Sequence, residues 1–145
     1  MSSFYDPRVN DDGSYDTLQI EKDGPIDWVT LNRPESLNSM SRELMLELQH
    51  YFGQLYTNFD TRVVLLTGAG RGFCAGLDLK EDRSDEGGGP VAGMRTQRRV
   101  SEIMMRMRRC LRNASSTTCY YGIEANPKFA GRLRKLEQEL RQRGL

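Results

Sequence analysis

The chain holds a single histidine and three cysteines among its 145 residues, and this scarcity limits the chemistry it can support. A zinc site built from histidine and cysteine needs three or four such ligands. His50 stands alone among polar neighbours, so we expect an exposed structural histidine and no metal site. Cys74, Cys110 and Cys119 form no CxxC pair and are odd in number, which favours reduced thiols over a disulfide scaffold.

Long hydrophobic runs are also missing. No apolar run approaches the roughly 20 residues that a membrane span requires. The first residues, Met1–Asp6, lack a basic stretch followed by an apolar core, so we expect no signal peptide. Together with a charged fraction of 28%, these absences predict a soluble, cytoplasmic protein.

The net charge of +1 conceals two halves of opposite sign. Residues 1–94 carry 8 basic and 16 acidic side chains, a net charge of −8. Residues 95–145 carry 13 basic and 4 acidic side chains, a net charge of +9. Such asymmetry can accompany nucleic-acid or membrane contact. We favour solvated arginine-rich helix faces, or a basic flank near an anionic ligand, and expect neither a nucleic acid nor a membrane as partner.

Hydrophobic periodicity predicts an α/β domain. Two short strands, at 18–20 and 26–31, flank a turn signal and form an antiparallel hairpin. A helix capped by Ser39 or Ser41 follows them. Its core-facing stripe contains Leu44, Leu48, Tyr51, Phe52 and Leu55. The apolar run Val63–Leu66 then predicts a buried parallel strand, completing a strand–helix–strand unit.

The second part of the chain is more polar. Residues 82–93 are acidic and rich in glycine, which predicts a loop, and a helix is expected to start near Thr96. Its apolar stripe contains Val100, Ile103, Met104, Met107 and Leu111. Residues 111–121 show no apolar strand. A last amphipathic helix, capped by Asn126, is expected to dock on the sheet, and its seam contains Phe129, Leu133, Leu136 and Leu140.

These elements divide the chain into three parts. Residues 1–16 are expected to form a flexible N-terminal arm. Residues 17–112 hold the α/β half-domain, and residues 113–145 form a divergent tail with its amphipathic helix.

A glycine-rich loop follows the Val63 strand, at the position where open α/β folds bind ligands. Its glycines are Gly68, Gly70, Gly72 and Gly76. No Gly-Lys-Ser/Thr follows, which argues against a P-loop. A dinucleotide-binding loop should open a long helix and a second strand, and neither pattern follows here. The remaining interpretation is that backbone amides of this loop polarise an acyl carbonyl.

Two motifs in this order resemble the crotonase family, which contains the enoyl-CoA hydratases and isomerases. They are the segment Asn32–Asn38 (NRPESLN) and, about thirty residues later, Leu66–Gly68 (LTG) with Phe73–Lys80 (FCAGLDLK). The resemblance covers about residues 18–110. It implies a partial crotonase-like α/β fold of the ClpP/crotonase type, with a ββα-type spiral core and C-terminal amphipathic helices.

The resemblance also implies a site for an acyl-CoA thioester. The residues it assigns to the coenzyme portion are Glu35, Ser36, Leu37, Leu77, Asp78, Leu79 and Lys80. The first three would lie against the adenine end, largely through backbone atoms. Leu77 would also supply, through its backbone N–H, one of two donors to the thioester oxygen. No separate cofactor is implied, because coenzyme A belongs to the substrate.

The family's second glycine-rich loop and its catalytic glutamates have no counterpart after Cys110. We therefore expect a protein that binds acyl-CoA and polarises the thioester carbonyl, with little or no hydratase activity. The alternative is a non-catalytic truncated form, or an interaction module that uses its basic amphipathic helices. A homo-oligomer is kept as a candidate assembly.

Overall fold

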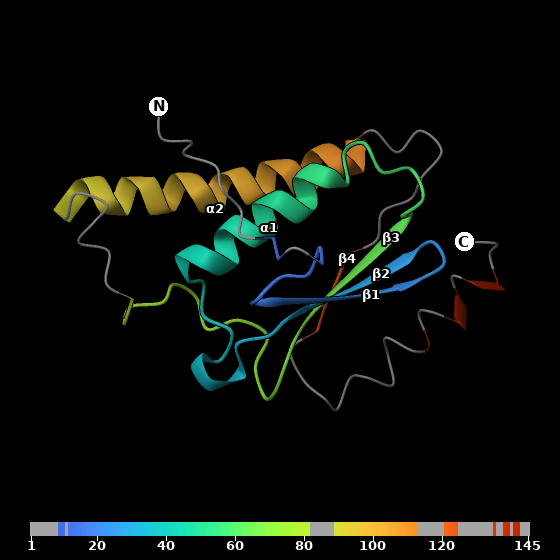
Figure 1. Cartoon of the computed structure of the whole chain (residues 1–145), viewed down its shortest axis with the longest axis horizontal. Helices are drawn as coiled ribbons and strands as arrows, with labels where there is room; N and C mark the ends of the chain where they lie inside the picture. The colour runs from blue at the N-terminus through green and yellow to red at the C-terminus, as the bar shows by residue number, and fades with distance from the viewer. Residues whose placement is uncertain are drawn as a thin grey trace.

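The computed structural model of the chain describes residues 9–10, 12–81, 89–112, 121–124, 135, 138–139 and 141–142. This described part forms a four-stranded sheet with two long helices on one of its faces (Figure 1). The strands lie in the order β1-β2-β3-β4, so their order in space follows their order in the chain. None of the helices described is apolar enough over a sufficient length to span a bilayer.

The predicted hairpin is confirmed. Strand β1 (Leu18–Asp23) extends beyond the predicted 18–20 and pairs antiparallel with β2 (Ile26–Leu31). Gly24 turns the chain between them with a φ of +58°, which glycine adopts without strain. Strand β3 (Val63–Gly68) pairs parallel with β2, as its continuous apolar run predicts.

Helix α1 (Arg42–Gln54) is capped by Ser41, whose Oγ accepts a hydrogen bond from the Leu44 amide at 3.1 Å. Of the two candidate caps, Ser41 is therefore the correct one. The buried face of α1 carries most of the predicted stripe. Leu44, Leu48, Tyr51 and Phe52 lie in one apolar cluster with residues of the sheet, among them Val29 and Val64.

Helix α2 (Gly89–Arg112) begins earlier than the sequence indicates, because residues 89–93, expected in a loop, are helical. Ile103 is buried in the core, and Val100 and Met107 pack against it as predicted. Met104 is instead 61% exposed. It lies about 100° around the helix from Ile103, which places it beside the buried face of α2 and not on it.

Strand β4 (Tyr121–Glu124) corrects the expectation that no strand follows the helix. It pairs parallel with β3, with Val64 opposite Tyr121. Its four residues, YGIE, are few, and glycine and glutamate are both depleted in strands, so the local signal is weak and the pairing with β3 completes the strand.

Beyond β4, the C-terminal tail is described only at residues 135, 138–139 and 141–142, which are helical, and the remainder of the predicted helix lies outside the described residues. Arg141 forms an ion pair with Asp23 at the end of β1. Most of the predicted N-terminal arm, residues 1–8 and 11, also lies outside the described residues.

Side chains of α1 hold the segment that leads into β1. Glu47 is fully buried and accepts hydrogen bonds from the Asp16 amide at 2.8 Å and from the amide and hydroxyl of Thr17. The Tyr15 hydroxyl lies 2.8 Å from Nδ1 of His50. His50 is therefore half-buried and bonded, which corrects the expectation of an exposed histidine.

Candidate functional site

Two loops meet at one end of the sheet. Because β2 and β3 are parallel, the turn that follows β2 and the loop that follows β3 leave the same edge, where open α/β folds place ligands. Both loops extend below the sheet in Figure 1. The Ala69 amide donates to the Leu31 oxygen at 2.8 Å, so the strand pairing continues into the loops. The two motifs found in the sequence are thus brought together.

Asn38 joins the beginning of the loop to the turn. The turn contains a short 3-10 helix, η1 (Pro34–Ser36), after which Leu37 and Asn38 both have positive φ values, of 53° and 56°. The fully buried Asn38 carboxamide donates to the main-chain oxygens of Ala69 at 2.8 Å and Gly72 at 2.7 Å. Its own oxygen accepts from the Arg33 amide at 2.8 Å.

The last residue of β3 has to be glycine. A Cβ atom on Gly68 would lie 2.5 Å from the main-chain oxygen of Phe73 and 2.6 Å from that of Gly72. These are backbone atoms of the loop, so no rotamer change could relieve the clash. The absence of a side chain lets the loop fold back against the end of its own strand.

A second set of hydrogen bonds joins the end of the loop to the turn. The Ala75 amide donates to the Leu37 oxygen at 3.0 Å, the Met40 amide to the Gly76 oxygen at 2.7 Å, and the Asp78 amide to the Met40 oxygen at 3.2 Å. Met40 and Leu77 consequently form an isolated parallel bridge.

This bridge leaves the amide of Leu77 free. The peptide between Gly76 and Leu77 is planar and trans, so its N–H points opposite to its C=O. The Gly76 oxygen faces Met40, and the N–H of Leu77 therefore points away from the turn. Within the described part of the chain, no group accepts a hydrogen bond from it. A fixed, unused N–H is what an oxyanion donor requires.

Charged side chains reinforce the junction. The Arg33 guanidinium donates to the Ser39 oxygen at 2.6 Å and to Oδ2 of Asp78 at 2.9 Å. Burial disfavours the Asp78 carboxylate, but hydrogen bonds from Arg33, the Lys80 amide and Ser39 outweigh it and lower the pKa of Asp78. Beyond the loop, the Glu81 carboxylate accepts from the first helical amide of α1, that of Arg42, at 2.9 and 3.0 Å.

The site residues implied by the resemblance fall on both sides of this junction. Glu35, Ser36 and Leu37 lie in or directly after η1, and the other four lie at the end of the loop. Leu77 is 46% exposed and Leu79 is 92% exposed. Lys80 is exposed as well. The surface beside the free amide is therefore apolar and basic.

The residues that organise the junction were assigned no role from the sequence. Asn38 and Arg33 lie within the first motif, and Met40 follows it closely. The available signal was the parallel arrangement of β2 and β3, which predicts that their loops meet. Asparagine is also a residue that tolerates a positive φ. Neither signal identifies the partner atoms, because these contacts depend on the path of both loops.

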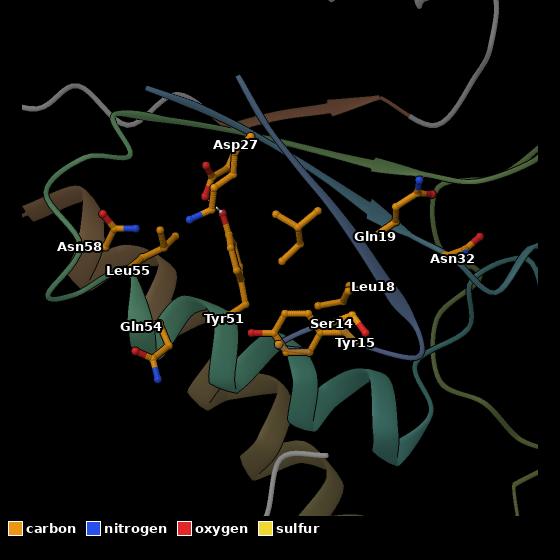
Figure 2. A pocket seen from close by; sticks show the side chains of 13 residues that line it. Ser14, Tyr15, Leu18, Gln19, Asp27, Asn32, Tyr51, Gln54, Leu55 and Asn58 are labelled. Atoms are coloured by element: carbon orange, nitrogen blue, oxygen red, sulfur yellow. Dashed lines mark hydrogen bonds between the residues drawn. The ribbon is translucent and has the colours of Figure 1, made fainter. Parts of the chain in front are cut away.

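Two cavities in the described structure lie elsewhere. The first, about 660 Å³, runs between the hairpin and α1. Figure 2 shows Tyr51 reaching across it from α1 to Asp27 on β2, where its hydroxyl donates to Oδ2 at 2.8 Å. The second, about 340 Å³, lies between α1 and α2. Neither is lined by Leu77, so an acyl pocket beside this amide stays a prediction.

One group of acidic side chains has the spacing of a metal site. Carboxylate oxygens of Asp16, Glu43 and Glu47 lie within 4.8 Å of one another. Both oxygens of Glu47 already accept hydrogen bonds from Asp16 or Thr17, which accounts for its burial without a metal.

Known proteins resemble the chain over the same region. The family model for enoyl-CoA hydratase/isomerase matches residues 21–110. A probable peroxisomal enoyl-CoA hydratase 1 of Arabidopsis thaliana is 37% identical over 94 residues, which are 59% of this chain and 36% of that protein. The 1,2-epoxyphenylacetyl-CoA isomerase of Escherichia coli is 42% identical over 80 residues, covering 54% of this chain and 30% of that protein.

The fold is similar to that of solved relatives. An enoyl-CoA hydratase/isomerase from Mycobacterium paratuberculosis has a TM-score of 0.59 at 29% identity, covering 76% of this chain and 41% of the other. An enoyl-CoA hydratase from Mycobacterium smegmatis has a TM-score of 0.60 at 30% identity, and the match covers 64% of this chain and 36% of the other. The predicted partial crotonase-like fold is confirmed. The chain spans about a third of the length of the curated relatives named above, and it belongs to the enoyl-CoA hydratase/isomerase family.

Proposed function

We propose that the chain binds an acyl-CoA thioester at the junction of the two loops and polarises its carbonyl with the Leu77 amide. The observation that carries this proposal is the N–H of Leu77, from which no described group accepts a hydrogen bond and which lies within the region matched by the family model. Coenzyme A enters only as part of this substrate. Its binding surface would be the backbone of Glu35–Leu37 together with residues 78–80.

The geometry suits the chemistry of a thioester. A carbonyl that is attacked, or that becomes an enolate, gains negative charge on its oxygen. A donor already held in place needs no reorganisation when this charge develops. The hydrogen bonds of Gly76 and Asp78 to Met40 hold Leu77 from both sides. The exposed side chains of Leu77 and Leu79 offer apolar contact beside it.

We propose binding and polarisation without efficient turnover. The resemblance supplies a single donor, and the residues it implies for the second donor and the catalytic acid–base group have no counterpart here. The chain should therefore show little or no hydration of crotonyl-CoA. Ordinary enzymatic turnover by this chain would contradict that part of the proposal.

The donor can be tested with a pair of ligands and a pair of variants. Butyryl-CoA carries the carbonyl, and its thioether analogue S-butyl-CoA lacks it. Leu77→Pro removes the N–H, whereas Leu77→Ala keeps it. Proline at this position breaks no main-chain pairing, because the bonds to Met40 involve Gly76 and Asp78.

Calorimetric titration should show that the parent chain prefers butyryl-CoA. One added hydrogen bond predicts a preference of about three- to tenfold over S-butyl-CoA. Leu77→Ala should retain this preference, and Leu77→Pro should lose it while remaining folded by circular dichroism. Equal affinities of the parent chain for the two ligands would refute the role of the amide.

A second candidate is an interaction module. Helix α2 leaves Met94, Met104 and Met105 exposed beside the exposed arginines 95, 98, 108 and 109. Exposed methionines can form adaptable binding surfaces. If neither CoA ligand binds, this candidate gains support. A cytoplasmic location, a homo-oligomer and the absence of a nucleic-acid partner stay predictions.

A further inference from the structure

Arg33 contacts three residues of the loop junction, two through its side chain and one through its backbone amide. Its guanidinium donates to the Ser39 oxygen at 2.6 Å and to the Asp78 carboxylate at 2.9 Å. Its own amide donates to the Asn38 carboxamide. The arginine and aspartate side chains are 21% and 10% exposed, so the pair is largely shielded from water. Arginine suits this position because its planar fork can hold two acceptors at once.

Asp78 is held from two directions. Its amide donates to the Met40 oxygen, and its Oδ2 accepts from Arg33. Its other carboxylate oxygen accepts from the Lys80 amide at 3.1 Å. Asp78 directly follows Leu77, so whatever fixes its Cα also fixes one end of the Leu77 residue.

The opposite end of Leu77 is much less constrained. Gly76 has a φ of +95°, and an added Cβ would meet nothing within 4 Å. A single hydrogen bond, from the Met40 amide to the Gly76 oxygen, sets the orientation of the Gly76–Leu77 peptide. Glycine adds no steric restraint of its own, so this peptide would turn if the Asp78 end of Leu77 were released. The direction of the Leu77 N–H therefore depends on the constraint at Asp78.

We propose that Arg33 is a positioning residue that aims the Leu77 amide through its ion pair with Asp78. This inference rests on the proposed function of that amide. In this proposal Arg33 acts through Asp78 and not through contact with the substrate, since its guanidinium donates to Ser39 and Asp78. Replacing Arg33 should therefore reduce recognition of the thioester carbonyl and leave recognition of the coenzyme largely intact.

The test uses variants on both sides of the pair. Arg33→Met and Asp78→Asn break it, and Arg33→Lys keeps the charge without the fork. Glu102→Gln is the matched control, because it removes the Arg106–Glu102 ion pair, 2.8 Å long, on α2. For each variant, affinities for butyryl-CoA and S-butyl-CoA are measured, together with the Leu77 amide resonance in ¹⁵N-labelled protein.

In the parent chain and in Glu102→Gln, butyryl-CoA should bind about three- to tenfold more tightly than S-butyl-CoA. In Arg33→Met and Asp78→Asn this ratio should fall to about one. In Arg33→Met, which changes no residue of the proposed coenzyme surface, the affinity for S-butyl-CoA should change by less than about fivefold. Arg33→Lys should give an intermediate ratio. Addition of butyryl-CoA should move the Leu77 resonance in the parent chain and not in the two pair-breaking variants.

Other outcomes would overturn the proposal in distinguishable ways. No preference for butyryl-CoA in the parent chain would remove the proposed function itself. A preserved ratio in folded Arg33→Met and Asp78→Asn would leave the Leu77 donor in place and exclude Arg33 as its positioning residue. An equal loss of affinity for both ligands would indicate that Arg33 contacts the coenzyme portion instead. Unfolding of all three variants would show that the pair supports the fold as a whole.

Discussion

The side-chain nitrogen of Asn38 lies 2.7 Å from the main-chain oxygen of Gly72, although the two residues are 34 positions apart. The same nitrogen donates to the Ala69 oxygen at 2.8 Å. One buried carboxamide thereby satisfies two carbonyl groups of the glycine-rich loop. It does so from a residue whose own φ, 56°, is uncommon for any side chain other than glycine, asparagine or aspartate.

Two substitutions of Asn38 separate the contribution of its carboxamide hydrogen bonds from that of its positive φ. Asn38→Gly leaves buried carbonyls without a donor, which should lower the free energy of unfolding by about 1–3 kcal/mol. Asn38→Ala should lower it by about a further 1–2 kcal/mol, because alanine resists a positive φ. Urea denaturation gives both values. Equal stabilities of the two variants would contradict the role of the left-handed backbone.

Gly68 and Gly93 should respond in opposite ways to alanine. At Gly68 a methyl group meets two main-chain oxygens, so Gly68→Ala should destabilise the protein by roughly 1–3 kcal/mol, as overpacking does. Gly93 lies within α2 with nothing near its Cβ position, so Gly93→Ala should stabilise by about 0.5–1 kcal/mol. Thermal unfolding of both variants measures these stability changes. Changes of the same sign in the two variants would contradict the prediction.

Tyr51 supports a buried carboxylate. Its hydroxyl and that of Thr61 donate to Oδ2 of Asp27, whereas Oδ1 of Asp27 has no partner among the described residues. Tyr51→Phe should therefore cost about 1–3 kcal/mol of unfolding free energy. Tyr56 is 47% exposed and provides the control. Tyr56→Phe should change stability by less than about 0.5 kcal/mol. Similar losses in both variants would argue against a specific role for the Asp27 bond.

Stability should depend on the ionisation of Glu47. Burial, aided by the nearby Glu43, raises the pKa of Glu47 above its ordinary value of 4.5, against the hydrogen bonds from Thr17 and Asp16. The folded state therefore binds this proton more tightly than the unfolded state does. The stabilisation is complete below pH 4.5 and is lost as the pH rises through the folded pKa.

Urea titrations across this pH window can isolate that contribution. The unfolding free energy of the parent chain, relative to that of Glu47→Gln, should decrease as the pH rises from 4.5. Glu21→Gln, an exposed control on β1, should leave the pH dependence of the parent chain in place. A relative stability that increases over the same window would contradict the raised pKa.

Much of the fold follows from patterns within single segments. The hairpin, the Ser41 cap of α1 and the buried β3 run each have a local signature, and the structure confirms them. The early start of α2 at Gly89 was missed because glycine and proline indicate a loop. Strand β4 was missed because Tyr121–Glu124 is only four residues long and includes glycine and glutamate, so its pattern is too short to indicate a strand without the edge of β3.

For the candidate site, the sequence predicts which two segments form it but not the contacts between them. The two motifs identify the turn and the loop, and parallel strands require the two to meet. The resemblance names the Leu77 amide as the donor, but the residues alone do not predict which amide stays free, because this depends on the register of the bridge between Met40 and Leu77. A shift of that register by one residue would turn the Leu77 amide toward the turn and consume it. Arg33 and Asp78 acquire their roles from the same register.

The sheet order β1-β2-β3-β4 has a consequence for synthesis on the ribosome. Residues up to Gly68 already include both neighbours of β2, so that strand can complete its ladder soon after it emerges. Strand β3 must wait for residues 121–124, which follow the whole of α2. During that interval a growing chain exposes the edge of β3 that β4 later covers, and this is the stage at which chaperone binding or aggregation of the nascent chain is expected.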